Sequence, residues 1–366
     1  MSYENGSVST RIFYVPRPMP RDAIERFAAH AAPPLDTLAD GEIRGWVTGR
    51  HMLDRAITDD TATYGGFLRL TLMQAVRKIP ESLLRAECRM EEIAHMKVEG
   101  TDRVTGSVRR KIRRSIEARQ LPQMPPQLKG IPFVYDARNE LLYVGALSGR
   151  QVDAFQIAFA QAIGFSLIPA TPDLAAMKRA QYNVRDWNPT SFSPDREDDE
   201  VSNDPGLDFL TWFWFVAEAR GGQMKIGDLG YIALMIEGPL QFVIEGAGAH
   251  VVTAKGGEPL LSAEAKSALL DGKKLRRAKV TLARGDQEWT FGFDAVPFTF
   301  RSLKLPEGEK LDAISKFQER MDLLDVFQRA FFGLYDRFIA ERRDPKLWSA
   351  TLKEIHAWVK DRRTRK

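Results

Sequence analysis

The hydrophobic and polar positions of this chain follow two periods, and the places where the period changes mark the expected elements. In Phe67–Met73, leucines at 68, 70 and 72 alternate with Arg69 and Thr71, which predicts a half-buried strand. The other strands are predicted at Ser7–Val15, Gly45–Met52, Phe165–Pro169, Tyr231–Ile236, Gln241–Ile244, Arg277–Ala283, Glu288–Phe293 and Phe298–Leu305, with a hairpin at Pro132–Val144.

Apolar residues three and four positions apart predict the helices. These are expected at Arg21–Ala31, from Pro80 onward, and at Thr105–Arg119, Gln151–Ile163, Leu207–Arg220, Ser262–Leu270 and Asp312–Arg342. The last is the longest, and its apolar positions come close to heptad spacing. That pattern is typical of a long core helix, and it also fits a helix that pairs with a second copy of the chain.

The elements predict an α+β fold with two α/β lobes and an inserted helical finger. The first lobe takes residues 1–79 and 131–188, and the finger between its two parts takes 80–130. Residues 189–206, rich in Ser, Pro and acids, predict a mobile acidic linker. The second lobe takes 207–343, and 344–366 form a basic helical tail.

Composition narrows the class of protein. The 366 residues are 44% hydrophobic, which is enough to bury a core and excludes wholesale disorder. Cys88 is the only cysteine, so the chain has no intramolecular disulfide and no Cys-rich zinc site. The polar first ten residues and the short apolar runs predict a cytoplasmic protein without a membrane span.

A search for catalytic signatures finds none of the common motifs for phosphate cradles, serine nucleophiles or zinc hydrolases. The five histidines are scattered, and none has a close metal-ligand partner in the sequence. A dense acidic run begins at Asp195, but it lies in the predicted linker, where no scaffold would hold a metal geometry. The chain is therefore expected to be no enzyme and to need no metal or cofactor.

Basic residues gather in two places, which matters more than the formal net charge of +4. The predicted second finger helix carries Arg109, Arg110, Lys111, Arg113, Arg114 and Arg119. At about 100° per residue, Arg109, Arg110, Arg113 and Arg114 fall on the side away from Val108, Ile112 and Ile116, with Glu117 as the one acidic interruption. A second cluster comprises Lys273, Lys274, Arg276, Arg277 and Lys279. Clustered cations attract phosphates, so both are candidate nucleic-acid contacts, although a solvated charged face fits the pattern too.

Read in order, several segments resemble the RdgC family of recombination-associated DNA-binding proteins. In the first lobe these are the opening strand, Gly45–Val47, the basic finger, Leu121–Pro122 with Phe133–Asp136, and Ser166–Pro169. In the second lobe they are Ala254–Lys255, Leu261–Glu264 with Gly272–Lys274, the strand 279–282, and Phe300–Leu305. Phe209–Phe215 looks like part of a longer, divergent branch. The resemblance spans roughly residues 10 to 340.

The resemblance implies a horseshoe-shaped monomer that pairs with a second copy into a ring around duplex DNA. It also implies sequence-independent, non-catalytic binding that restrains recombinase loading at the nucleoid, and it adds Lys255 to the candidate DNA contacts. The chain departs from the family pattern at Pro125, Gly256 and Gly257, near the expected subunit contacts, which puts ring closure in doubt.

Two alternatives belong to other functional classes. Members of the family have been labelled exonucleases, so a metal-dependent nuclease acting in recombination is the first alternative. The second is a protein-interaction module that uses the aromatic patch Trp212–Phe215, although Phe209, Trp212, Phe213 and Val216 share a helical face, as residues in a core do.

Overall fold

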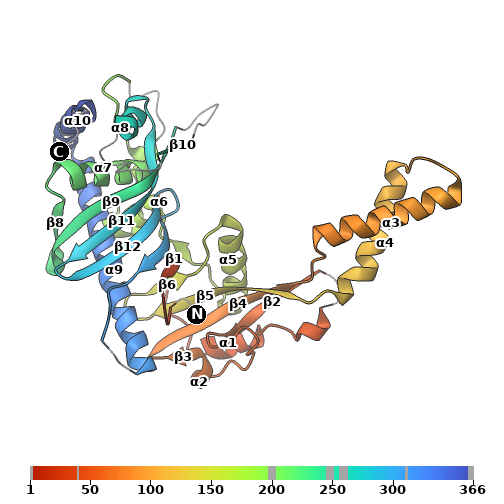
Figure 1. Cartoon of the computed structure of the whole chain (residues 1–366). Coiled ribbons are helices and arrows are strands. Elements are labelled where there is room, and N and C mark those ends of the chain that lie inside the picture. The colour runs from red at the N-terminus through yellow and green to blue at the C-terminus, as the bar shows by residue number, and fades with distance from the viewer. Residues whose placement is uncertain are drawn as a thin grey trace.

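The computed structural model describes residues 3–38, 41–196, 203–244, 251–254, 263–309 and 312–361. These residues form an α+β structure in which one large sheet carries helices on both faces, and a pair of helices projects from one end (Figure 1).

The strands pair antiparallel throughout the described residues. They are β1 Val8–Tyr14, β2 Glu42–Thr48, β3 Thr63–Tyr64, β4 Phe67–Val76, β5 Gln127–Asp136, β6 Leu141–Val144, β7 Ile168–Pro169, β8 Gln223–Ile226, β9 Gly230–Val243, β10 Val251–Ala254, β11 Lys274–Arg284, β12 Gln287–Asp294 and β13 Thr299–Lys304. Their main order is β10-β9-β11-β12-β13-β1-β6-β5-β4-β2, while β3, β7 and β8 pair with β4, β1 and β9.

The helices are α1 Ala23–Ala29, α2 Asp59–Ala62, α3 Glu81–Glu99, α4 Gly106–Gln120, α5 Gly149–Ile163, α6 Pro172–Ala180, α7 Pro205–Ala219, α8 Ala263–Leu270, α9 Ala313–Arg343 and α10 Pro345–Lys360. The predicted long helices all form, with ends shifted by one or a few residues. The sequence pattern missed α6, and it split β9 into two strands that the structure joins into one.

The two predicted lobes share one sheet, because β1 pairs with β6 on one side and with β13 on the other. The side chains of β1 alternate between two cores: Ile12 and Tyr14 pack with the helices of the C-terminal half, and Phe13 and Val15 pack with α1 and α5. A strand buried on both faces joins the halves more firmly than a linker between separate lobes would.

The long helix α9 lies inside the molecule rather than along a free surface. Of the apolar positions with near-heptad spacing, those from Phe317 to Phe338 are buried against β12, β13 and α7, and Ile314 at the start of the helix is exposed. Phe331, for example, contacts the rings of Phe209, Phe293 and Phe300. The apolar surface that suggested a dimer helix is therefore already covered by this chain.

The predicted linker and tail also belong to the core. Residues 190–193 are buried, although the sequence placed them in a solvated linker. Phe192 packs edge-on against Trp348 of α10, and Thr190 accepts a hydrogen bond from the Trp348 ring nitrogen at 3.3 Å. Residues 197–202, which carry most of the acidic run, lie outside the described residues.

Strand β4 is covered on both faces, not on one as its alternation predicted. Thr71 is buried, and so is Arg69, whose guanidinium lies over the rings of Tyr64 and Phe317 and forms an ion pair with Glu4. The N-terminal segment and α9 supply this second cover, and both are distant from β4 in sequence.

Candidate nucleic-acid interface

The helical pair α3 and α4 forms a finger that projects beyond the sheet (Figure 1). Strand β4 leads into α3, and β5 leaves α4 through a short turn at Leu121–Gln123. A small separate core holds the base of the finger together: Leu84 and Ile116 are buried there, with Ile112 and Cys88 half-buried beside them.

Local sequence explains where the finger helices begin and end. Gly100 ends α3 in the left-handed conformation, at φ +61°, which glycine adopts without strain. Thr105 caps α4, and its hydroxyl accepts a hydrogen bond from the Val108 amide. The two helices consequently fold back on one another across a short connection.

The basic side chains of α4 are all exposed, as the sequence pattern predicted. Three of them border α3, and we call these the seam arginines: Arg109, Arg113 and Arg119. Acidic residues of α3 bind each one. Arg119 pairs with Glu87 at 2.9 Å and Glu91 at 3.3 Å.

The other two seam arginines are also paired. Arg109 lies 3.4 Å from Glu92, and Arg113 lies 2.9 Å from Glu117 and 3.7 Å from Glu81. The hydrogen bond to Glu117 raises the pKa of Arg113, with further support from the charge of Glu81. The seam arginines therefore hold the finger together, and their charge is largely compensated.

Three other cations of α4 lie on the side away from Ile112 and Ile116, and we call Arg110, Lys111 and Arg114 the outward cations. None of them forms an ion pair with a residue that the structure describes. The sequence did not distinguish the outward cations from the seam arginines. The available signal was the row of acids on α3, where Glu87 and Glu91 are one turn apart and face α4.

The second predicted cluster is compensated by acids across the sheet. Arg277 lies 2.5 Å from Asp294 and Arg276 lies 3.5 Å from it, while Lys273 pairs with Asp271 at 2.8 Å. Lys279 pairs with Glu237 on the neighbouring strand β9. These residues form ion pairs on strand β11 and at its start, instead of a free basic patch.

Lys274 was predicted to contact DNA, and its position contradicts that role. Its side chain is 4% exposed, and its ammonium lies 2.6 Å from the fully buried carboxylate of Asp208 in α7. A phosphate on the surface cannot reach this group. Lys255, Gly256 and Gly257 lie outside the described residues.

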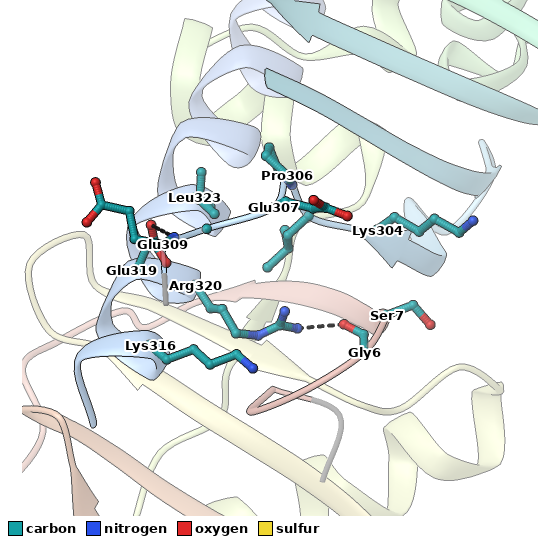
Figure 2. Close-up of a pocket in the computed structure, with 12 residues that line it drawn as sticks. Gly6, Ser7, Lys304, Pro306, Glu307, Glu309, Lys316, Glu319, Arg320 and Leu323 are labelled. Atoms are coloured by element: carbon teal, nitrogen blue, oxygen red, sulfur yellow. Dashed lines mark hydrogen bonds between the residues drawn. The ribbon is translucent and has the colours of Figure 1, made fainter. Parts of the chain in front are cut away.

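A hollow between α9 and the loop after β13 is a weaker candidate for a binding site. It measures about 780 Å³, but its polar groups hold the protein together (Figure 2). There Arg320 donates hydrogen bonds to the carbonyl oxygens of Tyr3 and Gly6, and burial lowers the pKa of Arg320. Lys304 points away from Arg320.

Two alternative functions find no support in the geometry. The aromatic patch Trp212–Phe215 is buried in the core, so it offers no surface to a partner. Within the described ranges, no three His, Cys, Asp or Glu residues come together as a metal site would require. Burial raises the pKa of Cys88, which is opposite to the shift that activates a thiol.

No protein-family model matches this chain, and no curated protein matches its sequence. Across the part of the chain that the structure describes, no helix combines the length and the apolar character that crossing a membrane requires.

Proposed function

We propose that this protein binds duplex DNA through its phosphate backbone, with the outward cations of α4 as the primary contact. As the resemblance to the RdgC family implies, the bound form is a dimer that encloses the duplex and restrains recombinase loading. The observation that supports DNA binding is the set of three uncompensated cations on the solvent side of a projecting helix.

Helix geometry suits this contact. The rise of about 1.5 Å per residue separates residues 110 and 114 by about 6 Å along α4. Duplex DNA carries a negative charge about every 1.7 Å along its axis, counted over both strands, and this density does not depend on base sequence. The outward cations can therefore approach the backbone at any site along the duplex. Such contacts carry no sequence information, which agrees with the sequence-independent binding that the resemblance implies.

The test compares two triple variants with the same change of charge. R110Q/K111Q/R114Q removes the outward cations, and R109Q/R113Q/R119Q removes the seam arginines. Affinity for a duplex of arbitrary sequence is measured at several salt concentrations. The outward variant should lose at least about tenfold in affinity, and its slope of log K against log salt should fall by about three units.

The seam variant should keep most of its slope, since its arginines are bound to glutamates before DNA arrives. It should instead destabilise the packing of α3 on α4 slightly, because exposed ion pairs contribute little to stability. Equal losses in both variants would mean that net charge alone drives binding. Unchanged affinity in the outward variant, with normal circular dichroism, would put the DNA on another surface.

Dimer formation is tested separately by light scattering at micromolar concentration, where a monomer mass would refute it. The apolar face of α9 is buried within the chain, apart from the exposed Ile314. The substitution Ile314→Asp should therefore leave the mass of the dimer unchanged. A dimer that dissociates on this change would show that α9 takes part in the interface after all.

A further inference from the structure

A second hollow, of about 540 Å³, opens at the root of the finger, and we call it the root hollow. Three strands and one helix contribute polar side chains to it. Arg44 of β2, Gln74 of β4 and Lys129 of β5 are direct cross-strand neighbours, and Ser148 and Arg150 come from the start of α5.

The sheet register explains why this polar row is open. The next row toward the body is Trp46, Leu72 and Ile131, which α1 and α5 cover. Strand residues two positions further on point to the same face. In this row Arg44 and Lys129 are exposed and Gln74 is half-buried, and the start of α5 lines the same hollow.

The charge of the root hollow is predominantly positive. Arg44 is paired with Glu42 at 2.5 Å, the one acidic side chain in its lining. Lys129 and Arg150 are exposed, and neither forms an ion pair with another described residue. The aligned backbone dipoles of α5 place partial positive charge at its N-terminus, and no acidic residue in its first turn offsets that charge.

We propose that the root hollow binds a phosphate group, held by Lys129 and Arg150 with the Gln74 amide as a further hydrogen-bond donor. Two cations and a neutral donor around one hollow match the chemistry of a phosphate, whose oxygens accept charge-assisted hydrogen bonds. The source is a backbone phosphate of bound DNA, and this assignment rests on the proposed function. A free phosphate ion has the same chemistry, and the experiment below distinguishes it from a backbone phosphate of DNA.

The position of the hollow favours the DNA source. Strands β4 and β5 run from its floor directly into α3 and out of α4, and Figure 1 shows α5 above these strands with the finger continuing from them. A duplex on the outward cations would extend along the finger toward its root. The root hollow would then hold a second, separate stretch of backbone.

The test uses K129Q/R150Q in the full chain, with K346Q/K353Q as a control of equal charge change. Lys346 and Lys353 are exposed on α10, on the opposite side of the molecule from the finger (Figure 1). Duplex affinity is measured against salt. In parallel, the melting temperature is measured with inorganic phosphate against chloride at equal ionic strength. Circular dichroism checks the fold of both variants.

If the hollow binds backbone phosphate, K129Q/R150Q loses at least about fivefold in affinity and about one unit of salt slope, while the control does not. If it binds free phosphate, that ion raises the melting temperature of the natural protein but not of K129Q/R150Q, and duplex affinity is unchanged. A natural protein that binds no duplex refutes the proposed function, yet the phosphate measurement still decides the hollow. Identical behaviour of both variants in both measurements overturns the proposal.

Discussion

Lys274, which the sequence predicted as a DNA contact, forms a buried ion pair with Asp208. Breaking this pair tests whether Lys274 stabilises the core or contacts DNA. The substitution Lys274→Met keeps the length of the side chain but removes its charge. It leaves the carboxylate of Asp208 fully buried with its cation gone. Lys274 also lies 5.7 Å from the centre of the Phe192 ring, so the methionine side chain enters an apolar neighbourhood.

The expected cost follows from the geometry. Two unit charges 2.6 Å apart attract by about 6 kcal/mol at an effective dielectric constant of about 20. Part of this attraction offsets the desolvation of both groups. Removing one partner of a buried pair typically costs about 3–5 kcal/mol, because the other charge stays buried without compensation. Neutralising both groups, as in K274M/D208N, should cost much less than Lys274→Met alone.

Urea unfolding of the natural protein, both single variants and the double variant measures this coupling. With an m value of about 3 kcal/mol per molar urea, the Lys274→Met midpoint should fall by roughly 1–1.7 M. The double variant should recover at least half of that loss. The salt slope of DNA binding should not change, since Lys274 contacts no phosphate.

Two results would refute this account. A Lys274→Met variant within about 1 kcal/mol of the natural protein would mean that Asp208 finds another partner or is not buried in solution. A Lys274→Met variant that folds normally yet loses a unit of salt slope would return Lys274 to the DNA interface.

Three further perturbations test the core. Burial raises the pKa of Tyr14 to about 12, so the folded state favours its protonated form and stability falls as pH rises from about 10 to about 12. Tyr14 contributes about 2–3 kcal/mol to this loss, measured by urea unfolding at the two ends of the range. Tyr14→Phe should reduce the loss by that amount, while Tyr3, Tyr143 and Tyr335, whose pKa burial also raises, still contribute in the variant. Trp348→Ala should cost about 3–5 kcal/mol, whereas Leu347→Ala at the exposed neighbouring position should change stability by less than about 0.5 kcal/mol; equal costs would mean that α10 does not pack on the body. Gly206→Ala should cost about 1–3 kcal/mol, because its new methyl group would meet the backbone of the β12–β13 turn; Gly106→Ala meets nothing within 4 Å and should be neutral or stabilising, so similar melting temperatures for the two variants would contradict the structure.

Hydrophobic periodicity predicted the helices and strands well, because it depends on residues within a few turns of each other in sequence. The amphipathic pattern of α4 placed Ile112 and Ile116 on the apolar side of the helix, and the structure buries or half-buries both. The same reasoning predicted α9 from its spacing, because a 3.6-residue period is a local property of the chain. The spacing could not show whether the apolar face of α9 packs against a second copy of the chain or against the rest of the same chain.

Most ion-pair partners of the basic residues could not be predicted from neighbouring positions in the sequence. The eleven basic residues of the two clusters looked alike in sequence. Their environments differ because acids distant in sequence lie beside some of them. Glu87 reaches Arg119 across 32 residues, and Asp208 reaches Lys274 across 66.

Burial of the segment 190–193 and of Arg69 has the same origin, since α9, α10 and the N-terminal segment cover them from remote parts of the chain. Hydrophobic periodicity and capping residues act within a few turns of the chain. The sequence therefore predicted most helices and strands and the basic character of the finger, although it missed α6 and split β9. Ion pairing and solvent exposure depend on which distant surfaces meet. The packing of α4 on α3 therefore leaves Arg110, Lys111 and Arg114 as the cations of α4 without an ion pair to a described residue. The packing of α7 on strand β11 buries Lys274.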